Sequence, residues 1–152
     1  MISHRLASLL SGVWAGVLLA LGGIGAPAGF AITEREIAGR VAGRMFAQEA
    51  YLSLALAVIL FVLLRQQARE AARSGSGSVL SADMLLVLGA LFCTVAGYFA
   101  LQPMMAAAKA GAPGTLSFAA LHGVSMGLFA LKALLVTLLA WRLTRVNPRP
   151  SS

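Results

Sequence analysis

The chain has 152 residues, of which 59% are hydrophobic and 11% are charged, with a formal net charge of +7 and a single cysteine. A soluble domain carries roughly 25% charged and about 45 to 50% apolar residues. So few charged residues cannot cover a globule in water, which excludes a soluble enzyme and a disordered chain, and one cysteine excludes a disulfide scaffold.

The apolar residues gather into four blocks that predict transmembrane helices. Each is close to or longer than the roughly 20 residues that span the hydrocarbon of a bilayer. Because that layer offers no partners for backbone amides and carbonyls, each block must be helical, and the period-two alternation of barrel strands is absent. We therefore predict an all-α polytopic membrane protein, a four-transmembrane-helix bundle forming one domain over residues 1–152. The predicted spans cover residues 6–32, 45–64, 84–107 and 118–141.

The basic residues predict the orientation of the bundle, because short cytoplasmic loops carry an excess of Lys and Arg. With the N-terminus inside, the inner ends carry Arg5, Arg65, Arg69, Arg73, Arg142, Arg145 and Arg149, and the outer ends carry Arg35, Arg40, Arg44 and Lys109. This distribution favours a multi-pass protein of the bacterial inner membrane with both termini in the cytoplasm. A signal peptide cleaved near Ala26-Pro27-Ala28 is the alternative, but the first apolar run exceeds the about 7 to 15 residues of such a segment.

The connections between spans carry helix-boundary signals. Thr33 and Glu36 have the spacing of a capping box, and Glu36 and Arg40 lie one helical turn apart. Ser81 suits the N-cap of the third span. A flexible linker is predicted over residues 74–78, chain breaks at Gly111, Pro113 and Gly114, and a frayed tail over residues 147–152.

Small residues four positions apart predict close helix packing in three spans. The three series are Ser8, Gly12, Gly16 and Ala20; Gly89, Cys93 and Gly97; and Ala119, Gly123 and Gly127. They suit either packing within one bundle or contact with a second copy or another membrane protein. Cys93 is expected to be a small buried hydrophobe.

Polar residues inside the spans are functional candidates, because the membrane makes them costly. Glu49 and His122 are expected about one and a half turns inside the outer ends of their helices, at a shared depth. With Gln102 and Ser125 they form a candidate polar layer, either a pocket in which Glu49 and His122 are hydrogen-bonded, or two independent side chains near the interface. Lys132 is expected near the midplane, as a charge in a transport path, as a cation paired with helix-end carbonyls or as a neutral amine, and no acid lies at an obviously matching depth.

A second hypothesis concerns soft metals, because thioether and imidazole ligands suit Cu(I). The candidate ligands are His122, Met126, Met104, Met105 and Met45. Methionine also fills irregular cores, so the pattern has an ordinary structural explanation. No catalytic constellation, cofactor motif or nucleic-acid-binding patch is visible, and the expected partner is the lipid bilayer.

Four segments resemble a known family. The segments are WAGVLLALGGIGAPAGFA, AGRVAGRMF, YFALQPMM and FAALHGVS. They resemble a bacterial family of uncharacterised four-span membrane proteins, which is known as a domain of unknown function. That family is similar to eukaryotic transmembrane protein 205. The most specific pieces are AG-x-x-x-G-x-x-F and F-x-x-LHG-x-S. The resemblance implies motif positions at Pro27, Phe30, Ala38, Gly39, Phe46, Pro103, Phe118, His122, Gly123 and Ser125.

The sequence thus predicts a small, non-enzymatic inner-membrane protein. It would act as a scaffold or accessory subunit, alone or as a homo-oligomer, or it would handle a small solute. The alternative is a soft-metal binding, transport or tolerance protein that uses an outward-facing layer of His, Met and Glu.

Overall fold

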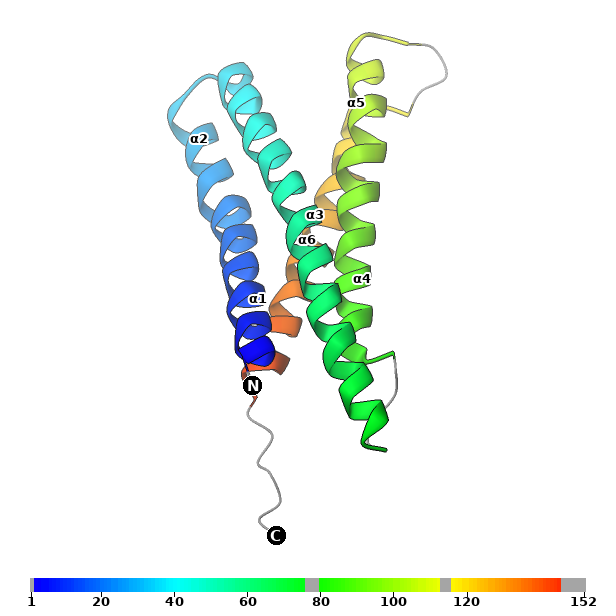
Figure 1. Cartoon of the computed structure of the whole chain (residues 1–152). Coiled ribbons are helices and arrows are strands. Elements are labelled where there is room, and N and C mark those ends of the chain that lie inside the picture. The colour runs from blue at the N-terminus through cyan, green and yellow to red at the C-terminus, as the bar shows by residue number, and fades with distance from the viewer. Residues whose placement is uncertain (1, 76–79, 113–115, 146–152) are drawn as a thin grey trace.

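The computed structural model describes residues 2–75, 80–112 and 116–145, and this part of the chain folds into helices and short connections (Figure 1). Four helical stretches are long and apolar enough to cross a membrane: Ile2–Ile32, Arg35–Arg73, Ala82–Lys109 and Phe118–Thr144. The all-helical, four-span prediction is confirmed. Residues 76–78 of the expected linker, Pro113, Gly114 and the tail 147–152 lie outside the described residues.

Two of the four spans change their helical pitch near a proline. The first span consists of α1 (Ile2–Ala20), the π-helical segment η1 (Leu21–Gly25) and α2 (Ala26–Ile32), and the third of α4 (Ala82–Thr94), η2 (Val95–Ala100) and α5 (Leu101–Lys109). Pro27 and Pro103 lack the N–H that a carbonyl four residues earlier requires, and those carbonyls lie in η1 and η2. The wider π turns adapt the backbone to the missing donor, so both spans continue.

The other two spans are uninterrupted helices, α3 (Arg35–Arg73) and α6 (Phe118–Thr144). The capping-box prediction is wrong at this boundary: Thr33 is an extended residue that closes α2, and Glu34 is the N-cap of α3. Only Thr33 and Glu34 separate the two helices, so Thr33 is the C-cap of α2 and the N-cap position of α3 falls on Glu34. The Ser81 cap is confirmed, since its hydroxyl accepts a 3.3 Å hydrogen bond from the Met84 amide. Arg40 and Glu36 form the expected pair at 2.6 Å.

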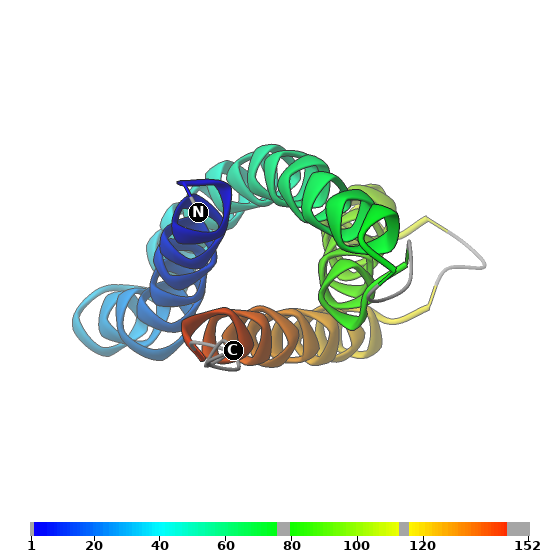
Figure 2. The ribbon, with the colours of Figure 1, turned by 60° about the horizontal axis from the view of Figure 1, so that its bottom comes forward.

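The four spans form a ring in which each helix packs against two neighbours (Figure 2). The helix α1 contacts α3 and α6, and α4 contacts the same two helices, so α3 and α6 lie on a diagonal. The largest fully buried side chains of the core are Trp14, Leu18, Leu60, Val87 and Leu139. These residues pack together in the half of the bundle nearer the chain termini.

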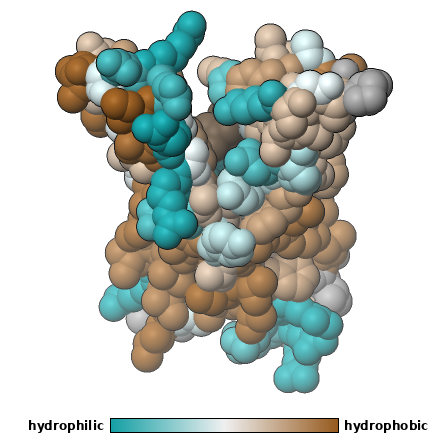
Figure 3. Space-filling model, turned by 90° about the horizontal axis from the view of Figure 1, so that it is seen from above, coloured by the Kyte–Doolittle hydropathy of each residue, from teal (hydrophilic) through white to brown (hydrophobic). Residues whose placement is uncertain are grey.

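At the opposite end the two helical hairpins diverge. In Figure 1, α2 and the start of α3 lean away from α5 and the start of α6, and Figure 3 shows the hollow between them with hydrophilic residues on both sides. We call this the open end and the other the terminal end. At the terminal end, Arg142 of α6 binds Asp83 of α4 at 2.6 Å.

The small-residue series divide into two kinds. A Cβ added to Gly89 or Gly97 would lie 3.0 Å from Leu135 Cδ1 or 3.2 Å from Leu128 Cβ, so this series packs against α6 within the bundle. Cys93, in the same series, is buried. By contrast, the glycines of the other two series face open space: Gly12, Gly16, Gly123 and Gly127. Packing within one bundle therefore explains only the series of the third span.

The close approach at Gly22 makes a testable prediction. A Cβ there would lie 2.7 Å from Phe129 Cε1, whereas a Cβ on Gly23 would meet nothing within 4 Å. We expect Gly22→Ala to destabilise the protein by about 1 to 3 kcal/mol through overpacking. Gly23→Ala, the matched control, should be neutral or slightly stabilising because alanine favours the helix. Thermal unfolding in detergent measures both, and equal melting temperatures for the two variants would contradict the packing described here.

Candidate functional site

The most unusual feature of the bundle is a buried ion pair. Lys132 Nζ donates hydrogen bonds of 2.8 Å to both carboxylate oxygens of Glu49. Glu49 is 5% exposed and Lys132 is 3% exposed. Among the described residues, these two are the charged side chains that the fold buries, and they bind each other.

The pair joins the two helices that face each other across the bundle. Glu49 lies 14 residues after Arg35, the first residue of α3, and Lys132 lies 14 residues after Phe118, the first residue of α6. Both helices start at the open end, so both charges lie about 21 Å along their helices. The expectation that no acid matches the depth of Lys132 is therefore wrong, because α3 begins ten residues before the predicted span and Glu49 is deeper than expected.

Two further side chains complete the site. The Ser53 hydroxyl, one turn along α3, donates to Glu49 Oε1, and its oxygen accepts a 2.8 Å hydrogen bond from Trp14 Nε1 of α1. Trp14 and Ser53 are fully buried. We call Trp14, Glu49, Ser53 and Lys132 the buried polar network. It connects three of the four spans.

An aromatic layer covers the network on the side of the open end. Phe46 and Phe129 each lie three residues before a charged residue, and their rings meet edge to face with centroids 5.2 Å apart. Lys132 Nζ lies 5.2 Å from the centroid of the Phe129 ring, within range of a cation–π interaction. We call Phe46 and Phe129 the phenyl pair. The cation is thus held by a carboxylate and an aromatic ring.

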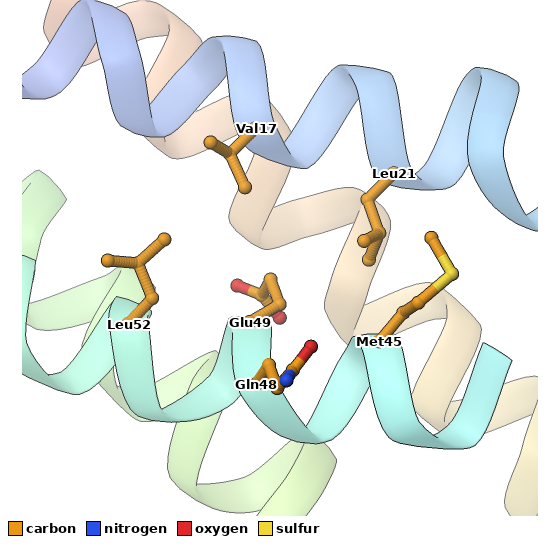
Figure 4. Close-up of a pocket in the computed structure, with 6 residues that line it drawn as sticks. All are labelled: Val17, Leu21, Met45, Gln48, Glu49 and Leu52. Atoms are coloured by element: carbon orange, nitrogen blue, oxygen red, sulfur yellow. The ribbon is translucent and has the colours of Figure 1, made fainter. Parts of the chain in front are cut away.

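A cavity of about 300 Å³ adjoins the network between the first span and α3 (Figure 4). Its lining residues are Val17, Leu21, Met45, Gln48, Glu49 and Leu52. Four of these side chains are apolar, and the two polar ones, Gln48 and Glu49, are neighbours on α3. The cavity therefore offers one polar wall and an otherwise apolar surface.

The expected polar layer is not assembled as one site. His122 is exposed and stacks on Phe118 with ring centroids 5.7 Å apart. It lies ten residues, about 15 Å, from Lys132 along α6, and the hydrogen bond expected between Glu49 and His122 is not formed because Glu49 lies deeper. Ser125 donates a 3.1 Å hydrogen bond to the Gly97 carbonyl in η2. Gln102 is exposed on α5.

The candidate soft-metal ligands also lie in different environments. Met45 lines the cavity, Met104 and Met126 are exposed, and Met105 is half-buried. The described residues hold no group of three or more His, Cys, Asp and Glu side chains that could bind a metal ion. Binding of a soft metal through His and Met stays a prediction.

Sequence reasoning missed Trp14, Ser53 and the phenyl pair as members of the site. Ser53 follows Glu49 by one helical turn, which is a signal for a local hydrogen bond. Trp14 carries no comparable signal, because an indole in an apolar span is ordinarily a core residue. Of the motif positions, Phe46 belongs to the phenyl pair and Ala38 is buried, whereas Phe30 and Phe118 are exposed.

The buried polar network predicts a strongly non-additive response to substitution. Lys132→Met alone leaves Glu49 as an uncompensated buried charge and should cost about 3 to 5 kcal/mol of unfolding free energy. The double variant Glu49→Gln, Lys132→Met removes both charges and should recover most of that loss. Arg40→Met, at an exposed ion pair, is the control and should cost at most about 1 kcal/mol. A double-mutant cycle in denaturant measures the coupling, and additive effects would refute the pairing.

Comparison with known proteins places these features in a family. Residues 9–113 match the model of a family described as Domain of unknown function (DUF4149). The match contains Trp14, Glu49, Ser53 and Phe46 and stops before α6, which supplies Lys132 and Phe129. No curated protein and no solved structure matches the chain. Because the match covers well over half of its length, the chain belongs to the DUF4149 family of proteins with a domain of unknown function.

Proposed function

We propose that this membrane protein is non-enzymatic and binds a small solute in the cavity beside Glu49. The observation that carries the proposal is a buried ion pair whose carboxylate also forms part of a cavity wall. Ionisable groups inside a membrane are costly and usually mark solute or ion pathways. A pair needed only for stability could be replaced by apolar side chains at little or no cost.

The volume and lining of the cavity limit the size and chemistry of the solute. A volume of about 300 Å³ lies at the lower end of the range of small-molecule sites. Val17, Leu21, Met45 and Leu52 favour an apolar group, while Gln48 and Glu49 supply hydrogen-bonding partners at one wall. The solute is therefore a small molecule with a short apolar body and a polar end.

The proposal includes the orientation and location of the protein. The excess of arginines near the terminal end favours both termini in the cytoplasm of a bacterium and the bundle in its inner membrane. The open end would then face outward. A solute would enter from that side.

A second candidate function is that of a membrane scaffold or accessory subunit. It is supported by Gly12 and Gly16 on α1, and Gly123 and Gly127 on α6, which face open space although small residues commonly mediate close helix contacts. A second copy or another membrane protein would then cover these surfaces. Substitutions separate the two functions, since a scaffold depends on the glycines and a solute-binding protein depends on the cavity.

Filling the cavity tests the proposed function. We expect Leu52→Trp, in the cavity wall, to abolish solute binding, whereas Leu134→Trp, 65% exposed on α6, leaves it unchanged. The readout is thermal unfolding in lipid nanodiscs with hexanoate, pentylamine, hexanamide and 2-aminohexanoate. A solute at about 100 times its dissociation constant stabilises the folded protein by about 2.7 kcal/mol, which raises the melting temperature by about 5 °C or more.

Two outcomes would contradict the proposal. One is that none of the four solutes raises the melting temperature of the unsubstituted protein. The other is that a solute stabilises Leu52→Trp as strongly as Leu134→Trp, which would place binding outside the cavity. If Gly12→Leu with Gly16→Leu dissociates a co-purifying partner while the cavity variants behave normally, the scaffold function replaces the proposed one.

A further inference from the structure

The helices α3 and α6 carry the same sequence pattern. Residues 46–60 read FAQEAYLSLALAVIL and residues 129–143 read FALKALLVTLLAWRL, with seven of 15 positions identical. The shared pattern is F-A-x-(E/K)-A-x-L-x-x-x-L-A-x-x-L. In this alignment Glu49 corresponds to Lys132, which lies 83 residues later, and Phe46 corresponds to Phe129.

The burial of the two helices repeats with the same offset. The buried residues of α6 are Leu121, Lys132, Val136, Leu139 and Leu143. The residues 83 positions earlier are Ala38, Glu49, Ser53, Leu56 and Leu60, and each of them is buried in α3. The two helices therefore present corresponding faces to the centre of the bundle.

The helices that precede them also correspond. Pro27 lies five residues before the end of the first span and Pro103 lies six residues before the end of the third, and a π-helical segment precedes each proline. Residues 2–73 thus form one hairpin, and residues 82–112 and 116–144 supply the two helices of a second hairpin with the same features and the same direction. Corresponding helices occupy opposite corners of the ring (Figure 2), so an approximate twofold axis runs along the bundle.

The axis passes between the corresponding residues that meet at the centre. Glu49 binds Lys132 and Phe46 contacts Phe129, so each repeat supplies one charge and one ring. In membrane proteins built from parallel repeats, solute sites lie near the midplane where the repeats meet. The charges of the two repeats are opposite, which makes this meeting point dipolar.

We infer that the meeting point of the two repeats binds a zwitterion with a short apolar chain, whose carboxylate pairs with Lys132 and whose ammonium group pairs with Glu49. This inference rests on the proposed function and names its solute class. A ligand with one charge would leave an unbalanced charge in the membrane interior. A zwitterion adds no net charge and replaces one ion pair by two, so both buried side chains keep partners.

The surroundings of the pair fit the rest of such a ligand. The cavity beside Glu49 is lined by Val17, Leu21, Met45 and Leu52, which suit an aliphatic chain. The hairpins diverge at the open end and are packed together at the terminal end (Figure 1), so the charges can separate by a movement of the hairpins at the open end. The phenyl pair lies between the open end and the charges, so the two rings must separate before the charges do.

A matched set of solutes tests the inference. The probe is 2-aminohexanoate, with hexanoate lacking its ammonium group and pentylamine lacking its carboxylate. We expect 2-aminohexanoate to bind the protein in nanodiscs about tenfold or more tightly than either control, because each lost charged hydrogen bond weakens binding by at least that factor. Isothermal titration calorimetry measures the three dissociation constants. Equal or tighter binding of hexanoate or pentylamine would overturn the inference while leaving the proposed function standing.

Two variants test the roles of the two charges. The neutral variant Glu49→Gln, Lys132→Met keeps no buried charge and should lose about tenfold or more in affinity for 2-aminohexanoate. The exchanged variant Glu49→Lys, Lys132→Glu keeps the pair across the approximate twofold axis and should bind the zwitterion in the reverse direction, within a few-fold of the unsubstituted protein.

A folded neutral variant that binds 2-aminohexanoate as tightly as the unsubstituted protein would overturn the inference. If the exchanged variant is folded, as judged by its melting temperature, but binds as weakly as the neutral one, the equivalence of the repeats is refuted. Failure of all four solutes to bind the unsubstituted protein would instead refute the proposed function itself.

Discussion

The cost of placing charge in hydrocarbon governs the centre of this protein. A carboxylate or an ammonium group without a partner is costly between apolar helices, so Glu49 and Lys132 each require the other at hydrogen-bonding distance. The pair links α3 to α6 across the diagonal of the ring, where the helix backbones make no extensive contact of their own. Ser53 and Trp14 extend the connection to α1. One electrostatic requirement thus determines the relative depth of two helices and joins three spans.

The backbone obeys the same requirement at the open end. Proline removes a hydrogen-bond donor that the membrane cannot replace, and in both spans the carbonyl concerned lies in a π turn. Ser125 of α6 donates to the Gly97 carbonyl of η2, which makes this residue, expected in a polar layer, part of a helix contact. The terminal end, packed around Trp14 and Leu139, meets no such interruption. Both π segments thus lie in the half of the bundle where the hairpins diverge.

The error in the predicted site has a single physical origin. Hydropathy locates the apolar part of a helix, and the helix itself extends as far as its backbone hydrogen bonds continue. Because α3 begins at Arg35 with an amphipathic segment, Glu49 lies deeper than an apolar block starting at Met45 indicates. An apolar block counted from Met45 therefore pairs Glu49 with His122, near the start of α6, and leaves Lys132 without an acid. Counting from the helix starts aligns Glu49 with Lys132.

The sequence alone determined the class of the protein, because composition and block length leave helical membrane spans as the only way to satisfy the backbone. It also located the Ser81 cap and identified Glu49 and Lys132 as costly residues, since both signals are local. The tertiary structure decided which of them meet. Which residues pair depends on the rotation and depth of two helices that are far apart in the chain. Glu49 and Lys132 are separated by 83 positions, and neither helix on its own specifies how the other is placed.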